Sequence, residues 1–293
     1  MKISLWLRAV RIRFLFASII GVINGLGISY WKYGSFDITY AILTCLGVIC
    51  LHVSVDLLND YWDYKRGIDK VTQRTKFSGG TGILPEKLLK PKTIYVAGIL
   101  FLLIGSLIGA YFVSIRGIII AIILTFAIFA IYFYSQKIVN IGLAELFVGI
   151  KSAMIVVGTF YVQTGLLDIS AFYIGIIIGI LSASVLFINS FPDYDADRQN
   201  GRRTLVIILG RKRGAKLFPF LIGISYGLIA AGVFFGYIKL YSLISFVSIP
   251  IAVRAILQLD ITKEKVESLL PVMTTTLLYS RITGIFLAIG LLI

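Results

Sequence analysis

Nine stretches of this sequence run for close to twenty residues with little or no charge. They are 14–31, 38–58, 94–113, 117–135, 142–163, 170–191, 217–236, 238–256 and 274–293. About twenty apolar residues in a helix cross the roughly 30 Å of hydrocarbon in a bilayer, where helices satisfy every backbone polar group internally. The pattern predicts an all-α, multi-spanning membrane protein with nine transmembrane helices around a central cavity.

The composition excludes an ordinary soluble domain. Hydrophobic residues make up 58% of the chain and charged residues only 14%, whereas soluble domains carry about 25% charged residues. No polar linker is long enough to separate two folded units, so we expect one membrane domain over residues 1–293. Cys45 and Cys50 both fall in the second stretch, which favours packing over a disulfide or zinc role.

The Lys and Arg residues predict the orientation of the chain. Most lie in the N-terminal segment and in the loops on the same side of the membrane, and only Lys32, Arg116 and Lys239 fall on the other side. Because cytoplasmic loops are enriched in Lys and Arg, we expect the N-terminus inside and the C-terminus outside a cell membrane. The first apolar run is too long for a signal peptide, so residue 1 is expected to be the mature start.

The net charge of +14 does not indicate a nucleic-acid partner, because positive-inside topology and attraction to anionic membrane lipid account for it. A basic inner face also attracts a polyanionic substrate such as a diphosphate. Two long loops on that face, about 64–93 and 198–216, are expected to form a lid.

Polar side chains form a line along one face of the second stretch and at the end of the sixth. His52, Asp56, Asn59 and Asp63 are spaced four, three and four residues apart, and Asn189, Asp193 and Asp197 are spaced four and four. These spacings place each set on one helical face, with a kink expected at Pro192. Ionisable groups at membrane helices are functional candidates by default, and these sets are expected to face a watery cavity.

Carboxylates and amides on two facing helix ends are suited to Mg²⁺, which takes oxygen ligands and shares them with substrate phosphates. The predicted ligands are Asn59, Asp63, Asp193 and Asp197, and a diphosphate leaving group between them would be neutralised by the metal. The cations expected to complete the clamp are Lys65, Arg74, Lys137, Arg202 and Arg203. Asp60 and Asp195 lie off the two lines and are expected to face water.

His52, Lys151 and Arg281 are basic residues that fall within the stretches. His52 is expected to be a satisfied buried histidine, whereas Lys151 and Arg281 either reach the membrane surface or face the cavity. Aromatic residues near the acids are candidates to line a prenyl channel and to stabilise an allylic cation. They are Tyr61, Trp62, Tyr64, Tyr132, Tyr134, Phe191 and Tyr194.

The acid-rich segments resemble those of the UbiA superfamily of membrane prenyltransferases. The first runs from Asn59 through Asp63 to Gly67-Ile68-Asp69, and the second from Asn189 through Asp193 and Asp197 to Leu205. They match that family's Asn-x-x-x-Asp and Asp-x-x-x-Asp motifs. The fuller family motif has a third acid where this chain has Gly67, and the resemblance implies that Asp69 substitutes as a metal ligand from a bend after the helix.

The first motif is most similar to that of the dihydroxynaphthoate prenyltransferases of menaquinone synthesis. The resemblance implies Mg²⁺-dependent transfer of a polyprenyl group from its diphosphate to an aromatic acceptor at the cytoplasmic face, with Asn189 and Tyr134 near the substrate. Three alternatives remain: transfer to an isoprenoid alcohol, geranylgeranylglyceryl phosphate; a CDP-alcohol phosphotransferase, whose continuous motif is absent; and a cation-coupled transporter, whose acids belong near mid-bilayer.

Overall fold

The computed structural model describes residues 3–71, 74–134, 137–261 and 266–293, and all regular structure within them is helical. The long helices are α2 (Ile12–Tyr33), α3 (Ile38–Arg66), α5 (Pro91–Arg116), α6 (Ile118–Phe133), α7 (Ala144–Thr164), α8 (Ile169–Asn189), α11 (Arg211–Phe234), α12 (Ile249–Gln258) and α13 (Leu270–Leu292). The short ones are α1 (Ile3–Ala9), α4 (Ile68–Val71), α9 (Tyr194–Gln199), α10 (Leu205–Leu209) and the 3₁₀ helices η1 (Ile138–Asn140), η2 (Leu240–Ser248) and η3 (Val266–Leu269).

Eight helical segments in the described residues are long and apolar enough to cross a membrane, which makes the chain a multi-pass membrane protein. The eight segments correspond to eight of the nine predicted stretches. The other stretch is α6, an apolar helix of only 16 residues. At 1.5 Å per residue it extends about 24 Å, less than the roughly 30 Å of hydrocarbon. The prediction of nine full-length spans is therefore not confirmed.

The eighth stretch differs from the single α-helix that was expected. It consists of η2 followed by α12, with Pro250 in the first turn of α12 where its missing N–H is tolerated. Ser242, Ser245 and Ser248 are buried along one side of η2, because a 3₁₀ helix has three residues per turn. A Cβ at Gly290 would stand 2.3 Å from the Cα of Ser242, so only glycine permits this close packing of η2 against α13.

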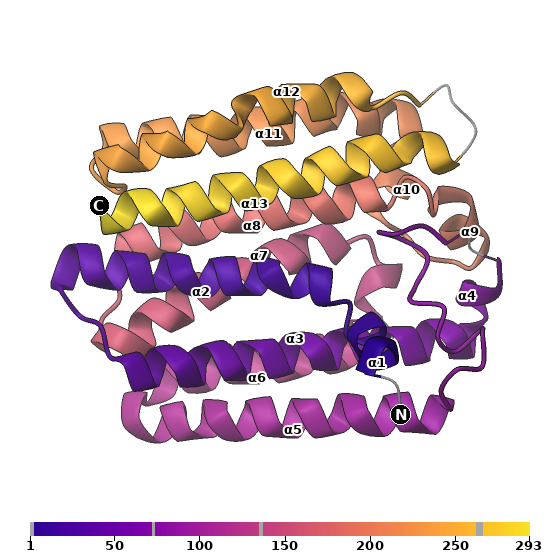
Figure 1. The fold of residues 1–293 in the computed structure, drawn as a ribbon, viewed down its shortest axis with the longest axis horizontal. Coiled ribbons are helices and arrows are strands. Elements are labelled where there is room, and N and C mark those ends of the chain that lie inside the picture. Colours follow the sequence, from indigo (N-terminus) through magenta and orange to yellow (C-terminus); the bar gives the residue numbers. More distant parts are fainter. Residues whose placement is uncertain (1–2, 72–73, 135–136, 262–265) are drawn as a thin grey trace.

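The helices pack as a bundle with unlike ends (Figure 1). Helix α7 packs on α8 and α2, α3 packs on α5, and α13 packs on α2 and α12. Short turns join the helices at one end, whereas α4, α9, α10 and the segment that follows α4 gather at the other end, on the right of Figure 1. All the long connections therefore lie over the helix ends that carry the acidic motifs.

Capping residues and one ion pair fix the end of the bundle opposite the acids. Gly34 ends α2 in the left-handed conformation, and Asp37 caps α3 by accepting a hydrogen bond from the Tyr40 N–H. Asp168 caps α8 through the Ser170 N–H at 2.7 Å and also binds the Lys32 ammonium at 3.1 Å. The caps fix where α2, α3 and α8 begin or end, and the Lys32–Asp168 pair joins the ends of α2 and α8.

Candidate active site

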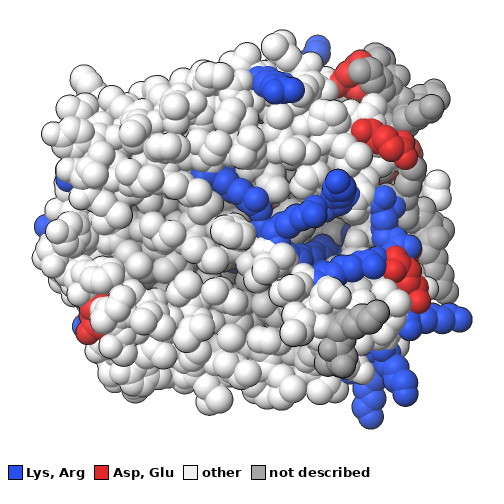
Figure 2. All heavy atoms as spheres, in the orientation of Figure 1, with Lys and Arg blue, Asp and Glu red and all other residues white. Residues whose placement is uncertain are grey.

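A cavity of about 400 Å³ opens at the end of the bundle that carries the long connections. It lies between α2, α3, α5, α6, α7, α8 and α13, and most of its lining is aliphatic and aromatic. Figure 2 shows Lys and Arg side chains gathered around a hollow on this side of the molecule. The cavity therefore combines an apolar interior with a charged rim.

The first acidic motif projects into the cavity from α3. His52, Asp56, Asn59 and Asp63 all line the cavity, as their spacing predicts. The Asn59 amide donates a hydrogen bond to Asp63 at 2.9 Å, which holds the buried Asp63 carboxylate in place. Gly67 then ends α3 with a φ of 80°, in the left-handed region that favours glycine.

Asp69 follows this turn at the start of α4, as the bend predicted from the sequence requires. It is buried and lines the same cavity as Asp63. Burial raises the pKa of the Asp69 carboxyl to about 7, and the nearby Asp63 and Asp60 act in the same direction. The structure thus brings Asp69 to the predicted metal site, although its role as a ligand stays a prediction.

The second motif forms a turn and a short helix rather than one kinked helix. Helix α8 ends at Asn189, and α9 begins at Tyr194, after Pro192. Asn189, Asp193 and Asp197 nevertheless all line the cavity. The Gly79 N–H donates to one oxygen of Asp193 at 3.2 Å, while the other oxygen, Oδ1, is buried without a hydrogen-bond partner.

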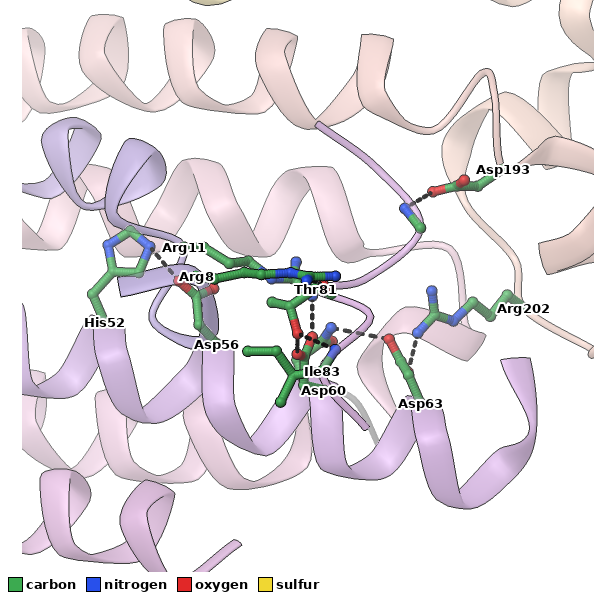
Figure 3. Close-up of polar contacts among 12 residues, drawn as sticks. Arg8, Arg11, His52, Asp56, Asp60, Asp63, Thr81, Ile83, Asp193 and Arg202 are labelled. Carbon is green, nitrogen blue, oxygen red and sulfur yellow. Dashed lines mark hydrogen bonds and ion pairs between the residues drawn. The ribbon is translucent and has the colours of Figure 1, made fainter. Parts of the chain in front are cut away.

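Arg202 joins the two motifs. Its guanidinium is paired with Asp63 of α3 and lies 3.2 Å from Asp197 of α9, as Figure 3 shows for Asp63. Although burial alone lowers the pKa of a guanidinium, the adjacent Asp63 and Asp197 carboxylates raise the pKa of Arg202 above its ordinary value. Arg202 was predicted to contact the substrate, and the structure places it between the acids of both motifs.

The segment after α4 lies over the acids at the end of the bundle that carries the long connections. Ser78, Gly79 and Gly80 line the cavity, and a Cβ at Gly80 would stand 2.7 Å from Oδ1 of Asp69. Gly80 also has a φ of 74°, so both its conformation and its contact require glycine. This segment lies within the predicted lid 64–93.

Asp60 was expected to face water, and this prediction was wrong. The Asp60 side chain is only 5% exposed and is held by Arg11 and by the Thr81 hydroxyl. Arg11 comes from the turn between α1 and α2, and Thr81 from the segment after α4, as Figure 3 shows. Asp60 therefore anchors the segment after α4 through Thr81. Helical spacing alone cannot predict this role. Asp195, by contrast, is 69% exposed, as expected.

Four of the five predicted clamp cations lie outside the cavity lining. Lys65 is exposed and stacks over the Tyr61 ring, Arg74 pairs with Glu86 at 2.5 Å, and Lys137 is exposed over the Phe133 ring. Arg203 is likewise absent from the lining, whereas its neighbour Arg202 belongs to it. The cations that do line the cavity with Arg202 are Arg11, Arg13, Lys151 and Arg281.

The structure resolves the two open alternatives for Lys151 and Arg281 in favour of the cavity. Sequence reasoning missed Arg11 and Arg13, because these residues precede the first apolar stretch and resemble ordinary membrane-flanking cations. Of the aromatic candidates only Tyr134 lines the cavity. The other rings are Phe14, Phe77, Phe112, Phe126 and Phe147.

The donor set suits a hard divalent cation. The available ligands are the carboxylate oxygens of Asp63, Asp69, Asp193 and Asp197 and the amide oxygen of Asn59. Oδ1 of Asp193 is buried without a hydrogen-bond partner. Burial raises the pKa of Asp193 to about 7, and Asp197 adds to that rise. Within the described residues no three acids, histidines or cysteines form a complete metal cage. Mg²⁺ is typically held by one or two carboxylates together with water and substrate phosphates, so these residues fit it.

Comparison with known proteins assigns the chain to a family. The model of the UbiA prenyltransferase family matches residues 18–280. The 1,4-dihydroxy-2-naphthoate octaprenyltransferase of Bacillus subtilis is 26% identical over 283 residues, which cover 95% of this chain and 89% of that protein. The Escherichia coli protein of the same name is 25% identical over 229 residues, covering 74% of this chain and 72% of that protein.

Solved structures show the same fold. A UbiA homologue from Archaeoglobus fulgidus, bound to DMAPP and Mg²⁺, superposes with a TM-score of 0.70 at 16% identity, covering 98% of each chain. The structure described for digeranylgeranylglyceryl phosphate synthase gives a TM-score of 0.66 at 17% identity, covering 99% of this chain and 98% of that one.

Proposed function

As a member of the UbiA prenyltransferase family this chain is a prenyltransferase, and we propose that it transfers a polyprenyl group from its diphosphate to a naphthoate-like aromatic acceptor. The observation that carries the proposal is the meeting of two acidic motifs above an apolar cavity. The relatives named 1,4-dihydroxy-2-naphthoate octaprenyltransferase support this acceptor, and the Bacillus subtilis protein matches 95% of the chain in sequence.

The acids define where the diphosphate would bind. Asn59, Asp63, Asp193 and Asp197, with Asp69 beside them, would hold Mg²⁺. When bound, the metal supplies positive charge to the diphosphate oxygens as the prenyl–oxygen bond breaks. The relative that binds DMAPP and Mg²⁺ supports this assignment. Arg202 adds a guanidinium at the same place, and its planar group is suited to phosphate oxygens.

The apolar part of the cavity would hold the prenyl chain. Its phenylalanine rings, among them Phe77, Phe126 and Phe147, exclude water from the breaking bond and offer ring faces to an allylic cation. An electron-rich ring carbon of the acceptor then forms the new bond to the prenyl carbon. The pair of electrons from the broken bond leaves with pyrophosphate, and the ring loses a proton or carbon dioxide.

The segments that cover the acids would act as the lid, and the site would face the cytoplasm. The lid comprises the segment of Ser78–Gly80 and the connection that carries Arg202. The cytoplasmic assignment rests on the distribution of Lys and Arg, which favours this end of the bundle. A cytoplasmic site in the cell membrane would have direct access to anionic prenyl diphosphates and to membrane lipid.

Geranylgeranylglyceryl phosphate is the second candidate acceptor. Its support is the fold similarity to digeranylgeranylglyceryl phosphate synthase. That similarity is structural at 17% identity, whereas the Bacillus subtilis naphthoate relative matches in sequence over 95% of the chain. We therefore place the aromatic acceptor first.

The test offers the purified protein Mg²⁺, geranylgeranyl diphosphate and either 1,4-dihydroxy-2-naphthoate or geranylgeranylglyceryl phosphate. We expect a prenylated naphthol and pyrophosphate from the first acceptor only, with no product from the Asp63→Ala variant. Product from geranylgeranylglyceryl phosphate alone would overturn the aromatic assignment. Undiminished activity in Asp63→Ala would overturn the role of the first motif.

A further inference from the structure

A second polar cluster lies in the cavity away from the metal-binding acids. It consists of Ser18 on α2, His52 and Asp56 on α3, and Lys151 on α7, all of which line the cavity. We call these four residues the deep polar cluster. The proposed diphosphate chemistry uses none of them, and a bilayer span admits polar groups only at a cost in free energy.

The helical rise places the cluster at one depth. Asp56 precedes Asp63 by seven residues on α3, a distance of about 10 Å along the axis. Lys151 follows Ala144, which lines the cavity at the start of α7, by seven residues, again about 10 Å. Figure 3 shows His52 and Asp56 displaced along α3 from Asp63 and Arg202.

Hydrogen bonds within the cluster leave one acceptor unmet. The His52 Nδ1 lies 2.7 Å from the Ser18 hydroxyl, and its Nε2 lies 3.8 Å from Oδ2 of Asp56, beyond hydrogen-bond distance. This Oδ2 is buried and has no hydrogen-bond partner. A buried acceptor without a donor is destabilising, so a ligand hydroxyl that donates to this oxygen would relieve the cost.

The same cluster carries an uncommitted cation. Lys151 interacts electrostatically with Asp56, but within the part of the chain that the structure describes it forms no ion pair or hydrogen bond. Arg13 and Arg281 also line the cavity, and the Arg281 guanidinium donates to the backbone carbonyl of Arg13. Lys151, Arg13 and Arg281 therefore add positive charge to the cavity lining, which favours an acidic ligand group.

We propose that the deep polar cluster binds the polar end of the acceptor, with Lys151 paired to an acidic group and Asp56 accepting a hydrogen bond from a hydroxyl beside it. The inference rests on the proposed function, since the acceptor must enter this cavity. An aromatic ortho-hydroxy acid has both groups. Anchored here, its ring carbon is directed toward the prenyl carbon at the metal-binding acids, where reacting atoms must approach to about 3–3.5 Å.

The test uses two ligands that differ by one group. Calorimetry would measure the binding of 1,4-dihydroxy-2-naphthoate and of 1,4-dihydroxynaphthalene, which lacks the carboxylate, to the full chain with Mg²⁺ and an unreactive thio-analogue of geranylgeranyl diphosphate. We expect Lys151→Met to weaken the naphthoate at least about tenfold, the loss of one charge-assisted contact. The affinity of Lys151→Met for 1,4-dihydroxynaphthalene should differ from that of the wild type by less than about twofold.

Asp56→Asn is the second variant, since it keeps the size of the side chain and removes its charge. It should weaken both ligands, because both carry the hydroxyl. Lys92→Met, at an exposed position at the start of α5, is the matched control and should bind both ligands as the wild type does. Kinetics should show a raised KM for the acceptor and an unchanged KM for the prenyl diphosphate in Lys151→Met.

The outcomes separate this inference from the proposed function. If the wild type prenylates the naphthoate but Lys151→Met binds it with unchanged affinity, the inference is overturned and the proposed function stands. If geranylgeranylglyceryl phosphate alone binds, and Lys151→Met weakens it tenfold, the aromatic acceptor fails while the acid-binding cluster stands. An equal rise in the KM for the acceptor and the KM for the prenyl diphosphate in Lys151→Met would also overturn the inference. So would a wild type that binds neither acceptor.

Discussion

Arg202 is paired with Asp63, a residue 139 positions earlier in the chain. The pair joins the connection after α9 to the last turns of α3, and Arg202 also reaches Asp197. One guanidinium thus lies between acids that are proposed to hold Mg²⁺. Metal, arginine and diphosphate would share a single electrostatic site.

Substitution of Arg202 tests this arrangement. Arg202→Ala leaves the buried Asp63 and Asp197 without their counter-charge, and breaking a buried pair costs about 3–5 kcal/mol. We expect a lower unfolding temperature in detergent without divalent metal, with a larger stabilisation by Mg²⁺ than in the wild type. Thermal unfolding with and without Mg²⁺ measures both, and an unfolding temperature unchanged by the substitution would contradict the pairing.

Local spacing explains which parts of the site the sequence could predict. The four-residue spacing of Asn59 and Asp63 predicts that they share one face of a helix, and in the structure both line the cavity. The partners of Arg202 and Asp60 could not be predicted, because they depend on how segments far apart in the chain pack. The ninth predicted span is not confirmed, because hydropathy identifies α6 as apolar but does not give the helix ends that set its length of 16 residues.

Gly80 is expected to matter for activity more than for folding. Gly80→Ala introduces a left-handed alanine, which costs about 1 kcal/mol, and its Cβ would press on Oδ1 of Asp69 at 2.7 Å. Prenyl transfer should therefore fall by about tenfold or more. Steady-state rates and thermal unfolding would be measured together.

The matched control is Gly67→Ala. Gly67 has a similar φ of 80°, but nothing lies within 4 Å of its built Cβ. Gly67→Ala should lose about as much stability as Gly80→Ala, whereas its rate of prenyl transfer should fall less. Equal loss of rate in the two variants would count against a special role for the contact with Asp69.

Asp168 should make stability depend on pH at the opposite end of the bundle. Burial alone raises its pKa, but hydrogen bonds from the Ser170 N–H, Lys32 and Tyr33 outweigh burial and lower the pKa below its ordinary value. The charged carboxylate therefore stabilises the fold above about pH 4. That contribution disappears as the pH falls through the lowered pKa.

Asp168→Ala removes both the helix cap and the ion pair, and should cost about 1 kcal/mol or more at pH 7. Asp168→Asn keeps a capping oxygen and should cost less. Unfolding measured from pH 7 down to pH 3 should show the difference between wild type and Asp168→Asn shrinking toward the acidic end. A difference that grows on acidification would refute the assignment.

The most direct test of the central claim compares Asp193→Asn with Asp195→Asn in the Mg²⁺-dependent prenyl-transfer assay. Asp193 lines the cavity with an unpartnered oxygen, whereas Asp195, two residues away, is 69% exposed and pairs with Arg211 at the surface. We predict that Asp193→Asn lowers the rate at least about 100-fold, the size of effect seen when a charge-stabilising group is removed. Asp195→Asn should stay within about twofold, since surface ion pairs contribute little. Equal rates in the two variants would contradict the proposal that the two cavity-facing acidic motifs hold the metal and the diphosphate.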